Sequence, residues 1–368
     1  MNPFRYGCIV NGDFFCPRPD LERELKRLIL SGQNVVIQGE RRIGKTSLVC
    51  ETIRKARGVK LLYIDLLGIK TTVDLCRKIT TSVVQLDKRQ SFLKKTAELL
   101  SRLRPTLTID TNTGTPTLSV DVGASSAPDS LEDILDMVAF HARKEKLCVV
   151  FDEFQDILRI ENADAILATM RGKIQFQSET PYVFLGSIRN EMSAMFTNSR
   201  SPFYKSAALF DIGRIDDDDF ADFLTRRFKT GRRSVTREAI SSILDATDRV
   251  SGDVQELCDA LWATTEPGST ITEADIPDAL DLVFSRESKA YTPIVTSLTA
   301  IQMRVLRGIA QYGGRAILSG EFLSRVGMRN PGSVRKSVLR MVGLDILYDH
   351  ECEYKFSNPF FRIWLLKN

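Results

Sequence analysis

The feature that most constrains this chain is the stretch G-E-R-R-I-G-K-T-S at residues 39–47. It matches the pattern G-x-x-x-x-G-K-[ST], in which glycines let the backbone curl until successive N–H groups point at bound phosphates. A short apolar run at 34–38 precedes the loop, and residues 47–53 continue with helical periodicity. A strand, a glycine-rich loop and a helix in this order predict a parallel α/β fold with a nucleoside triphosphate site. A glycine turn with an incidental lysine is the alternative.

The residue types in the loop have distinct expected roles. Lys45 is expected to reach the β and γ phosphate oxygens and so to serve both binding and catalysis, while the Thr46 hydroxyl ligates Mg²⁺. The expected cofactors are therefore ATP and Mg²⁺. The remaining loop residues expected to surround the phosphates are Gly39, Glu40, Arg41, Arg42, Ile43, Gly44 and Ser47.

Apolar runs alternate with helical stretches along the first part of the chain. The further strands are expected at 59–66, 147–153, 182–187 and 207–212, and the helices at 72–104, 131–143 and 163–175. This alternation predicts a parallel sheet whose ligands sit at the carboxyl ends of the strands. Between the helices expected at 72–104 and 131–143, polar and apolar residues alternate on both sides of N-T-G-T-P. This alternation predicts an inserted β-hairpin at about 105–123.

Polar residues follow two of these strands. Asp152 can hold Mg²⁺ through its water shell, and Glu153 can orient or deprotonate an attacking water. Ser187, or Arg189 with Asn190, follows the neighbouring strand and can reach the γ-phosphate. The two acids make hydrolysis chemically possible, whereas a purely structural helix N-cap is the alternative.

The rest of the chain predicts two smaller domains. Residues 216–285 read as purely helical, with Gly252 between helices, and predict a lid. Three helices followed by a hairpin then predict a winged helix. Its helices are expected at 298–312, 319–326 and 332–342, and its hairpin at 347–356. The expected domains are a core at 1–213, a lid at 214–290 and a winged helix at 297–368.

Charge is spread unevenly along the chain. From residue 297 onward there are eleven basic and five acidic residues, whereas the whole chain has 51 and 47. A basic last domain is expected where the partner is a polyanion, and a solvated surface is the competing explanation. The candidate contacts with duplex DNA are Arg329, Arg335, Lys336 and Arg340. If they cluster on one exposed face, DNA is favoured over a protein partner.

Other classes of protein are disfavoured. No run approaches the roughly 18 apolar residues of a membrane span, and the N-terminus has no signal-peptide core, so we expect a cytoplasmic protein without a membrane partner. A nucleotide kinase is disfavoured because neither an acceptor-binding motif nor a second arginine-rich lid is visible.

The ordered set of motifs resembles the archaeal-type ATPase family, on the STAND/AAA+ side of the P-loop NTPases and related to the Orc/Cdc6 initiators. The matching segments are F-C-P-R-P-D-L-E at 15–22, the R-R-x-G-K-T-S loop, F-D-E-F-Q at 151–155, G-S at 186–187 and S-N-P-F-F-R-I-W at 357–364. The resemblance covers nearly the whole chain and implies an ATPase core, a helical lid and a C-terminal winged helix. By the same resemblance Pro17 and Arg18 lie near the adenine and ribose. Asp152 and Glu153 form Walker B, and Ser187 is sensor 1.

Two departures from the family pattern imply slow hydrolysis. Gln255 stands in G-D-V-Q where the initiators place an arginine that contacts phosphate, and Lys205 replaces the arginine of a Gly-Arg pair. A correctly placed arginine finger raises turnover by about 10³ to 10⁵, so an isolated subunit lacking both is expected to be slow. A neighbouring copy in a homo-oligomer would have to supply one, and the candidates are Arg171, Arg189 and Arg200.

These observations predict an ATP- and Mg²⁺-dependent switch whose output is DNA or partner binding. The rival hypothesis is a nucleotide-stabilised scaffold in which the winged helix binds protein alone.

Overall fold

The computed structural model describes residues 2–86, 105–109, 116–120, 127–186 and 189–368. The chain forms two compact units. One is the core, Ile9–Gly213, and the other joins the N-terminal residues up to Cys8 with Arg214–Asn368.

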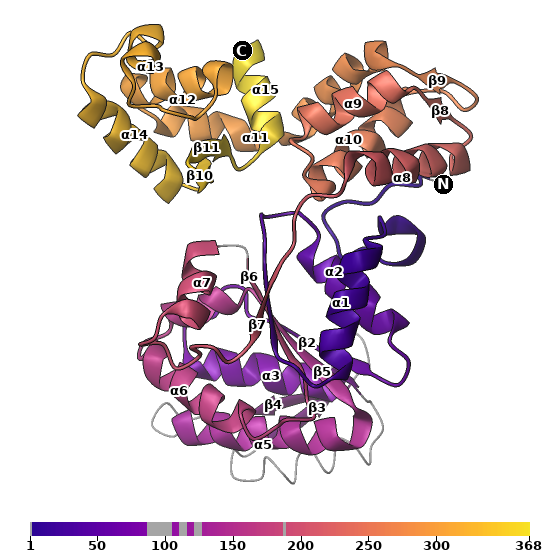
Figure 1. The fold of residues 1–368 in the computed structure, drawn as a ribbon, viewed down its shortest axis with the longest axis vertical. Coiled ribbons are helices and arrows are strands. Elements are labelled where there is room, and N and C mark those ends of the chain that lie inside the picture. Colours follow the sequence, from indigo (N-terminus) through magenta and orange to yellow (C-terminus); the bar gives the residue numbers. More distant parts are fainter. Residues whose placement is uncertain (1, 87–104, 110–115, 121–126, 187–188) are drawn as a thin grey trace. The chain divides into compact units, whose positions relative to one another are not determined.

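Among the described residues of the core, five parallel strands form one sheet in the order β2-β5-β6-β1-β7 (Figure 1). They are β1 (Val35–Gln38), β2 (Lys60–Asp65), β5 (Leu147–Asp152), β6 (Tyr182–Gly186) and β7 (Ala208–Asp211). Central parallel strands are covered on both faces, and for this reason they read as nearly continuous apolar runs in the sequence. All the predicted strands of the sheet are confirmed. Because β6 lies between β1 and β5, the carboxyl ends of the three strands converge at one edge.

Helices cover both faces of the sheet, as Figure 1 shows. The apolar side chains of α1 (Pro19–Leu30) and α2 (Lys45–Lys55) pack on one face. The helices on the other face are α3 (Thr72–Leu86), α5 (Ala127–Glu145), α6 (Ala163–Ile174) and α7 (Arg189–Thr197). The short 3₁₀ helix η4 (Phe154–Arg159) follows β5 on this second face. The predicted helix 72–104 is thus confirmed as far as Leu86, and its remainder lies outside the described residues.

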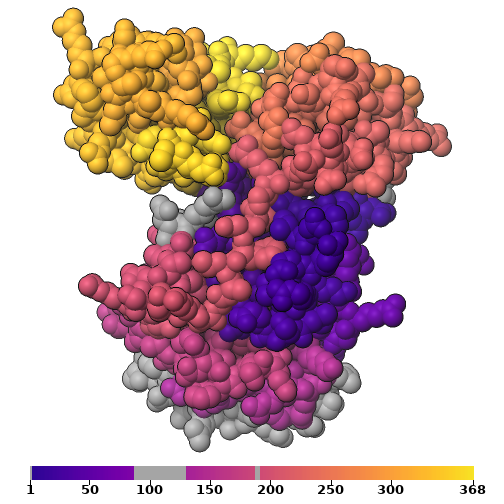
Figure 2. Space-filling model, viewed as in Figure 1, coloured from indigo at the N-terminus to yellow at the C-terminus, as the bar shows by residue number. Residues whose placement is uncertain are grey.

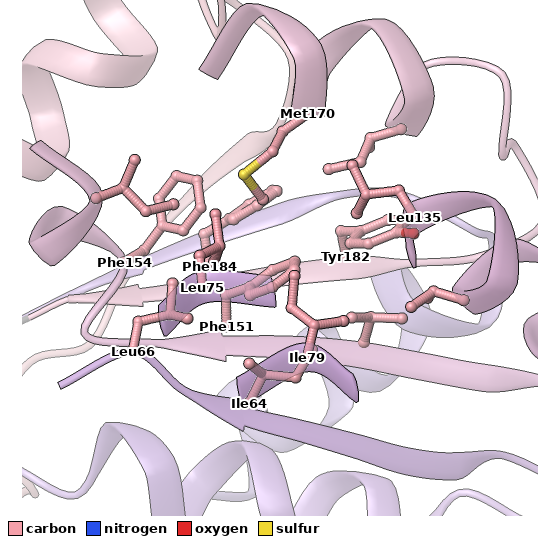
Figure 3. Close-up of a cluster of buried hydrophobic side chains, with 14 of the residues drawn as sticks. Ile64, Leu66, Leu75, Ile79, Leu135, Phe151, Phe154, Met170, Tyr182 and Phe184 are labelled. Carbon is pink, nitrogen blue, oxygen red and sulfur yellow. The ribbon is translucent and has the colours of Figure 1, made fainter. Parts of the chain in front are cut away.

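An aromatic cluster fixes the end of β5 (Figure 3). The ring of Phe151 lies 6.0 Å from that of Phe184 on β6, and Phe154 lies 4.6 Å from the same ring. All three side chains are fully buried. Each contributes on the order of 1.5–3 kcal/mol through burial, so the backbone on both sides of Asp152 is firmly held.

The predicted hairpin is present as β3 (Pro105–Ile109) and β4 (Pro116–Val120), which pair antiparallel. Its predicted turn lies outside the described residues.

The second unit contains the lid helices and a part that the sequence did not anticipate. The helices are α8 (Asp217–Thr230), α9 (Arg237–Ala246), α10 (Ser251–Thr264) and α11 (Ile276–Ser297). The prediction of a purely helical lid is wrong, because β8 (Ser234–Val235) and β9 (Thr270–Ile271) form a short parallel pair. Gly252 lies in the first turn of α10 rather than between helices. The N-terminal segment belongs here: the Arg227 guanidinium donates to the Pro3 carbonyl, and the ring of Phe4 lies 4.6 Å from that of Phe228.

The winged helix has the predicted order of three helices and a hairpin. The elements are α12 (Ala300–Tyr312), α13 (Gly320–Arg325), α14 (Pro331–Gly343), β10 (Leu347–His350) and β11 (Glu353–Phe356). A closing helix, α15 (Pro359–Lys367), was not predicted. It packs on α11, where the ring of Tyr291 lies 5.1 Å from that of Phe361 and 5.3 Å from that of Trp364.

Candidate functional site

The two motif glycines are required for different physical reasons. Gly44 precedes α2 with φ +95°, a left-handed conformation that side chains disfavour. At Gly39 space is the constraint, since a Cβ would lie 2.6 Å from Cγ2 of Ile212 and 3.2 Å from Cγ2 of Ile43. The glycines therefore allow the loop both to turn sharply and to pack against the end of β7.

Lys45 is the first residue of α2 and is only 8% exposed. Its Nζ donates to the carbonyls of Gly39 at 3.1 Å and Glu40 at 2.8 Å, so the ammonium lies across the start of the loop. Arg41 and Arg42 are exposed, and Arg42 has φ +60°. The lysine charge is held within the loop, at the place where the motif requires it.

Asp152, the last residue of β5, accepts hydrogen bonds from side chains of α2 and β2. Its Oδ2 accepts hydrogen bonds from Thr46 Oγ1 at 2.7 Å and from the Tyr63 hydroxyl at 2.8 Å. Its Oδ1 accepts one from the backbone N–H of Glu153 at 2.9 Å. The pKa of Tyr63 is raised, mainly by burial and secondly by the nearby negative charge of Asp152. The phenol therefore stays protonated and can donate a hydrogen bond. Sequence reasoning paired Thr46 with Asp152 but missed Tyr63, which looks like an ordinary strand former in β2.

Glu153 is held in an unusual conformation beside this carboxylate. Its φ of +51° lies in the left-handed region, which is uncommon for residues other than glycine. Its Oε2 accepts a hydrogen bond from Nε2 of Gln155, a side chain that is 3% exposed. Gly186 at the end of β6 makes room for this arrangement, because a Cβ there would lie 2.6 Å from Oε1 of Gln155. Gln155 therefore orients Glu153, a role that sequence reasoning did not assign.

Arg18, the N-cap residue of α1, hydrogen-bonds directly to the loop. Its Nη2 donates to the Ile43 carbonyl at 2.8 Å and its Nη1 to the Gly213 carbonyl at 2.6 Å. On the face seen in Figure 2, indigo atoms from the N-terminal part of the core lie beside rose atoms from its C-terminal end. Burial lowers the pKa of Arg18 to about 10. The neighbouring Pro17 is exposed.

The structure gives less information about the positions of several other residues that the sequence predicts for the site. Ser187 lies outside the described residues. Arg189 begins α7, but its side chain is also outside them. Gln255 is buried in α10 of the second unit, whereas Lys205 and Arg200 are exposed on the core.

Three of the four basic residues proposed to contact DNA share one face of α14. Arg335, Lys336 and Arg340 are exposed on α14 and fall within about 140° of the helix circumference. Arg329 is exposed just before the Asn330 cap of this helix. The opposite face of α14 is buried and consists of Val334, Ser337, Val338 and Met341. Leu339, 58% exposed, lies among the basic residues.

The residues of the core fit a magnesium-bound triphosphate. Mg²⁺ prefers hard oxygen ligands, and the loop brings the Thr46 hydroxyl and the Asp152 carboxylate together. Anionic phosphates suit a glycine-rich loop that opens a helix and carries a buried lysine, as residues 39–47 do. Among the residues that the structure describes, no helix is long and apolar enough to cross a membrane.

Comparisons with known proteins support this description of the fold. A family model described as "Probable winged helix domain" matches residues 289–367. A search of curated protein sequences gave no match. Among solved structures, a Walker-type ATPase of Pyrococcus abyssi aligns with TM-score 0.63 and 17% identity, covering 97% of both chains.

Two ORC proteins of Aeropyrum pernix also align. ORC1, solved in complex with DNA, has TM-score 0.51 and 12% identity over 97% of this chain and 93% of its own. ORC2, solved with ADPNP and ADP, has TM-score 0.52 and 14% identity over 95% and 90%. The chain therefore has the fold of archaeal Orc-type and Walker-type P-loop ATPases, with a C-terminal winged helix, as the sequence motifs predicted.

Proposed function

We propose that this chain binds ATP with Mg²⁺ in the loop 39–47 and hydrolyses it slowly, as a nucleotide-dependent switch. The observation that carries the proposal is the 2.7 Å contact between Thr46 Oγ1 and Asp152 Oδ2, which lie 106 residues apart in the sequence. The Thr46 hydroxyl and the Asp152 carboxylate would hold Mg²⁺, which would supply positive charge to neutralise the charge that develops during phosphoryl transfer. Lys45 would stabilise the same oxygens from the loop.

Glu153 is the proposed general base. Its carboxylate would accept the proton of a water as that water attacks the γ phosphorus and the bond to the ADP oxygen breaks. Gln155 donates a hydrogen bond to one carboxylate oxygen of Glu153 and so orients the proposed base. Slow turnover follows from Gln255 and Lys205, which replace guanidinium groups expected from the family pattern. In a homo-oligomer, the exposed Arg200 is a candidate to supply that charge to a neighbouring copy.

Two variants separate binding from hydrolysis. Lys45→Ala is expected to lose ATP binding in calorimetry while its circular dichroism melt stays close to that of the parent protein. Glu153→Gln is expected to bind ATP normally and to release phosphate at least about 100-fold more slowly, since the amide cannot accept a proton. Lys70→Ala, an exposed lysine outside the site, is the matched control. Near-normal ATP affinity in folded Lys45→Ala would refute the proposal.

We propose further that the basic face of α14 binds duplex DNA. With roughly four phosphate contacts, log K should fall with log salt at a slope of about −3 to −4. Changing Arg335, Lys336 and Arg340 together to alanine should flatten the slope by nearly three, whereas Leu339→Ala should leave it unchanged.

The exposed Leu339 favours the alternative, a scaffold whose winged helix binds protein. In that case Leu339→Ala would weaken partner binding. The full chain with ATP would also show no DNA affinity even at about 50 mM salt, where screening is weak.

A further inference from the structure

The winged helix has a second candidate surface, and none of the residues that line it belongs to α14. A hollow of about 430 Å³ lies between α12 and the C-terminal end of α13. Its apolar lining includes Met303, Gly308 and Val326. Gly308 is needed for the close packing of the two helices here, because a Cβ would lie 2.1 Å from Cγ1 of Val326.

Three arginines also line the hollow. Arg304 and Arg307 are exposed one turn apart on α12, and Arg325 faces them from the end of α13. Arg325 lies 5.1 Å from the centre of the Tyr312 ring and pairs with Glu321 at 2.7 Å. Among the described residues that line the hollow, none carries a carboxylate. The hollow therefore combines apolar side chains with three arginines in one lining.

We propose that this hollow binds an acidic peptide segment of a partner protein, with one apolar side chain inserted between α12 and α13. Charge complementarity selects the acidic flanks, because guanidinium groups recognise carboxylates by paired hydrogen bonds. The apolar lining selects the anchor, and the flexible Met303 thioether adapts to its shape. A duplex presents phosphates on a convex surface and would leave this apolar lining unused. The proposal does not depend on ATP binding or on the DNA-binding role of α14.

The test uses the full chain and a fluorescein-labelled peptide of aspartates and glutamates around one central phenylalanine. Fluorescence polarisation should show saturable binding. Arg307→Glu should weaken it at least about tenfold, as expected for one lost charge-assisted pair. Replacing the central phenylalanine by alanine should weaken binding by a similar factor. Lys289→Glu, at an exposed position of α11 that does not line the hollow, is the charge-reversal control and should leave peptide binding unchanged.

A second measurement locates the peptide. The chain has eight methionines, so methyl-labelled methionine gives a small set of signals, and Met303→Leu identifies the one that should shift on binding. Three results would overturn the proposal. One is the absence of saturable peptide binding by the parent protein. The others are peptide binding that shifts no Met303 signal, and Arg307→Glu acting only on duplex DNA binding or on association between copies of this chain.

Discussion

Arg18 provides a quantitative test of how the loop is held. Burial lowers its pKa to about 10, which corresponds to a cost of about 3 kcal/mol for keeping the guanidinium charged inside the protein. Its hydrogen bonds to the carbonyls of Ile43 and Gly213 return about 1.5–3 kcal/mol each. The two bonds together return about 3–6 kcal/mol, which leaves a balance of about 0–3 kcal/mol, so Arg18→Met should lower the free energy of unfolding by no more than about 3 kcal/mol. The core should stay folded.

Nucleotide affinity should respond differently from stability. The bond to Ile43 orients the loop directly, and losing its roughly 1.5 kcal/mol would favour loop conformations that do not bind phosphate. We therefore expect Arg18→Met to bind ATP about tenfold more weakly. The assay is calorimetric titration with ATP, alongside thermal melts. Arg23→Met, an exposed arginine of α1 whose partner is Asp20, is the matched control and should change neither quantity.

Inorganic tripolyphosphate distinguishes this positioning role from direct contact with the nucleoside. If Arg18 positions the loop, Arg18→Met should weaken ATP and tripolyphosphate by the same factor. If it contacts the ribose, as the family resemblance implies, only ATP should be affected. Arg18 does not position the loop if Arg18→Met melts normally and binds both ligands within about twofold of the parent protein. A twofold change in affinity is far smaller than the change expected from losing one charge-assisted hydrogen bond.

Two further predictions concern residues around the loop. Tyr63→Phe removes one of the two hydroxyl donors on Asp152 Oδ2 and should reduce the Mg²⁺-dependent gain in ATP affinity by up to about tenfold, while metal-free binding stays constant in the same titration. An unchanged gain would contradict a role for Tyr63 in placing the carboxylate. The pKa of Glu51 is lowered to about 2, first by its hydrogen bond with Arg54, so its stabilising effect is complete above its ordinary pKa of about 4.3 and is lost as pH falls toward 2. Denaturant titrations of Glu51→Gln should therefore show a shallower loss of stability over that acidic interval, and a loss as steep as in the parent protein would count against this linkage.

The sequence predicted the sheet well because the signals for its strands are local. Runs such as 147–152 are apolar at every position, and a fully buried strand leaves the same pattern wherever it pairs. The short strands β8 and β9 have only two residues each, too few for a periodic signal, and residues 236–269, which form helices and loops, lie between them in the sequence. Helix α15 begins with the capped sequence Asn358-Pro359 and was treated as a family motif rather than as an element.

The candidate site shows a different limit of sequence reasoning. Thr46 and Asp152 could be predicted from motifs because their chemistry is fixed by residue type and by position, Thr46 at the start of a helix and Asp152 at the end of a strand. Tyr63 and Gln155 act through their neighbours, and those neighbours are set by sheet register and by a left-handed turn at Glu153. Arg18 shows the same dependence, since its two carbonyl partners are 25 and 195 residues away in the sequence. Residues proposed to touch a ligand can thus be predicted from motifs, whereas residues that position them depend on tertiary contacts, and the variants of Arg18 and Tyr63 test contacts that only the structure reveals.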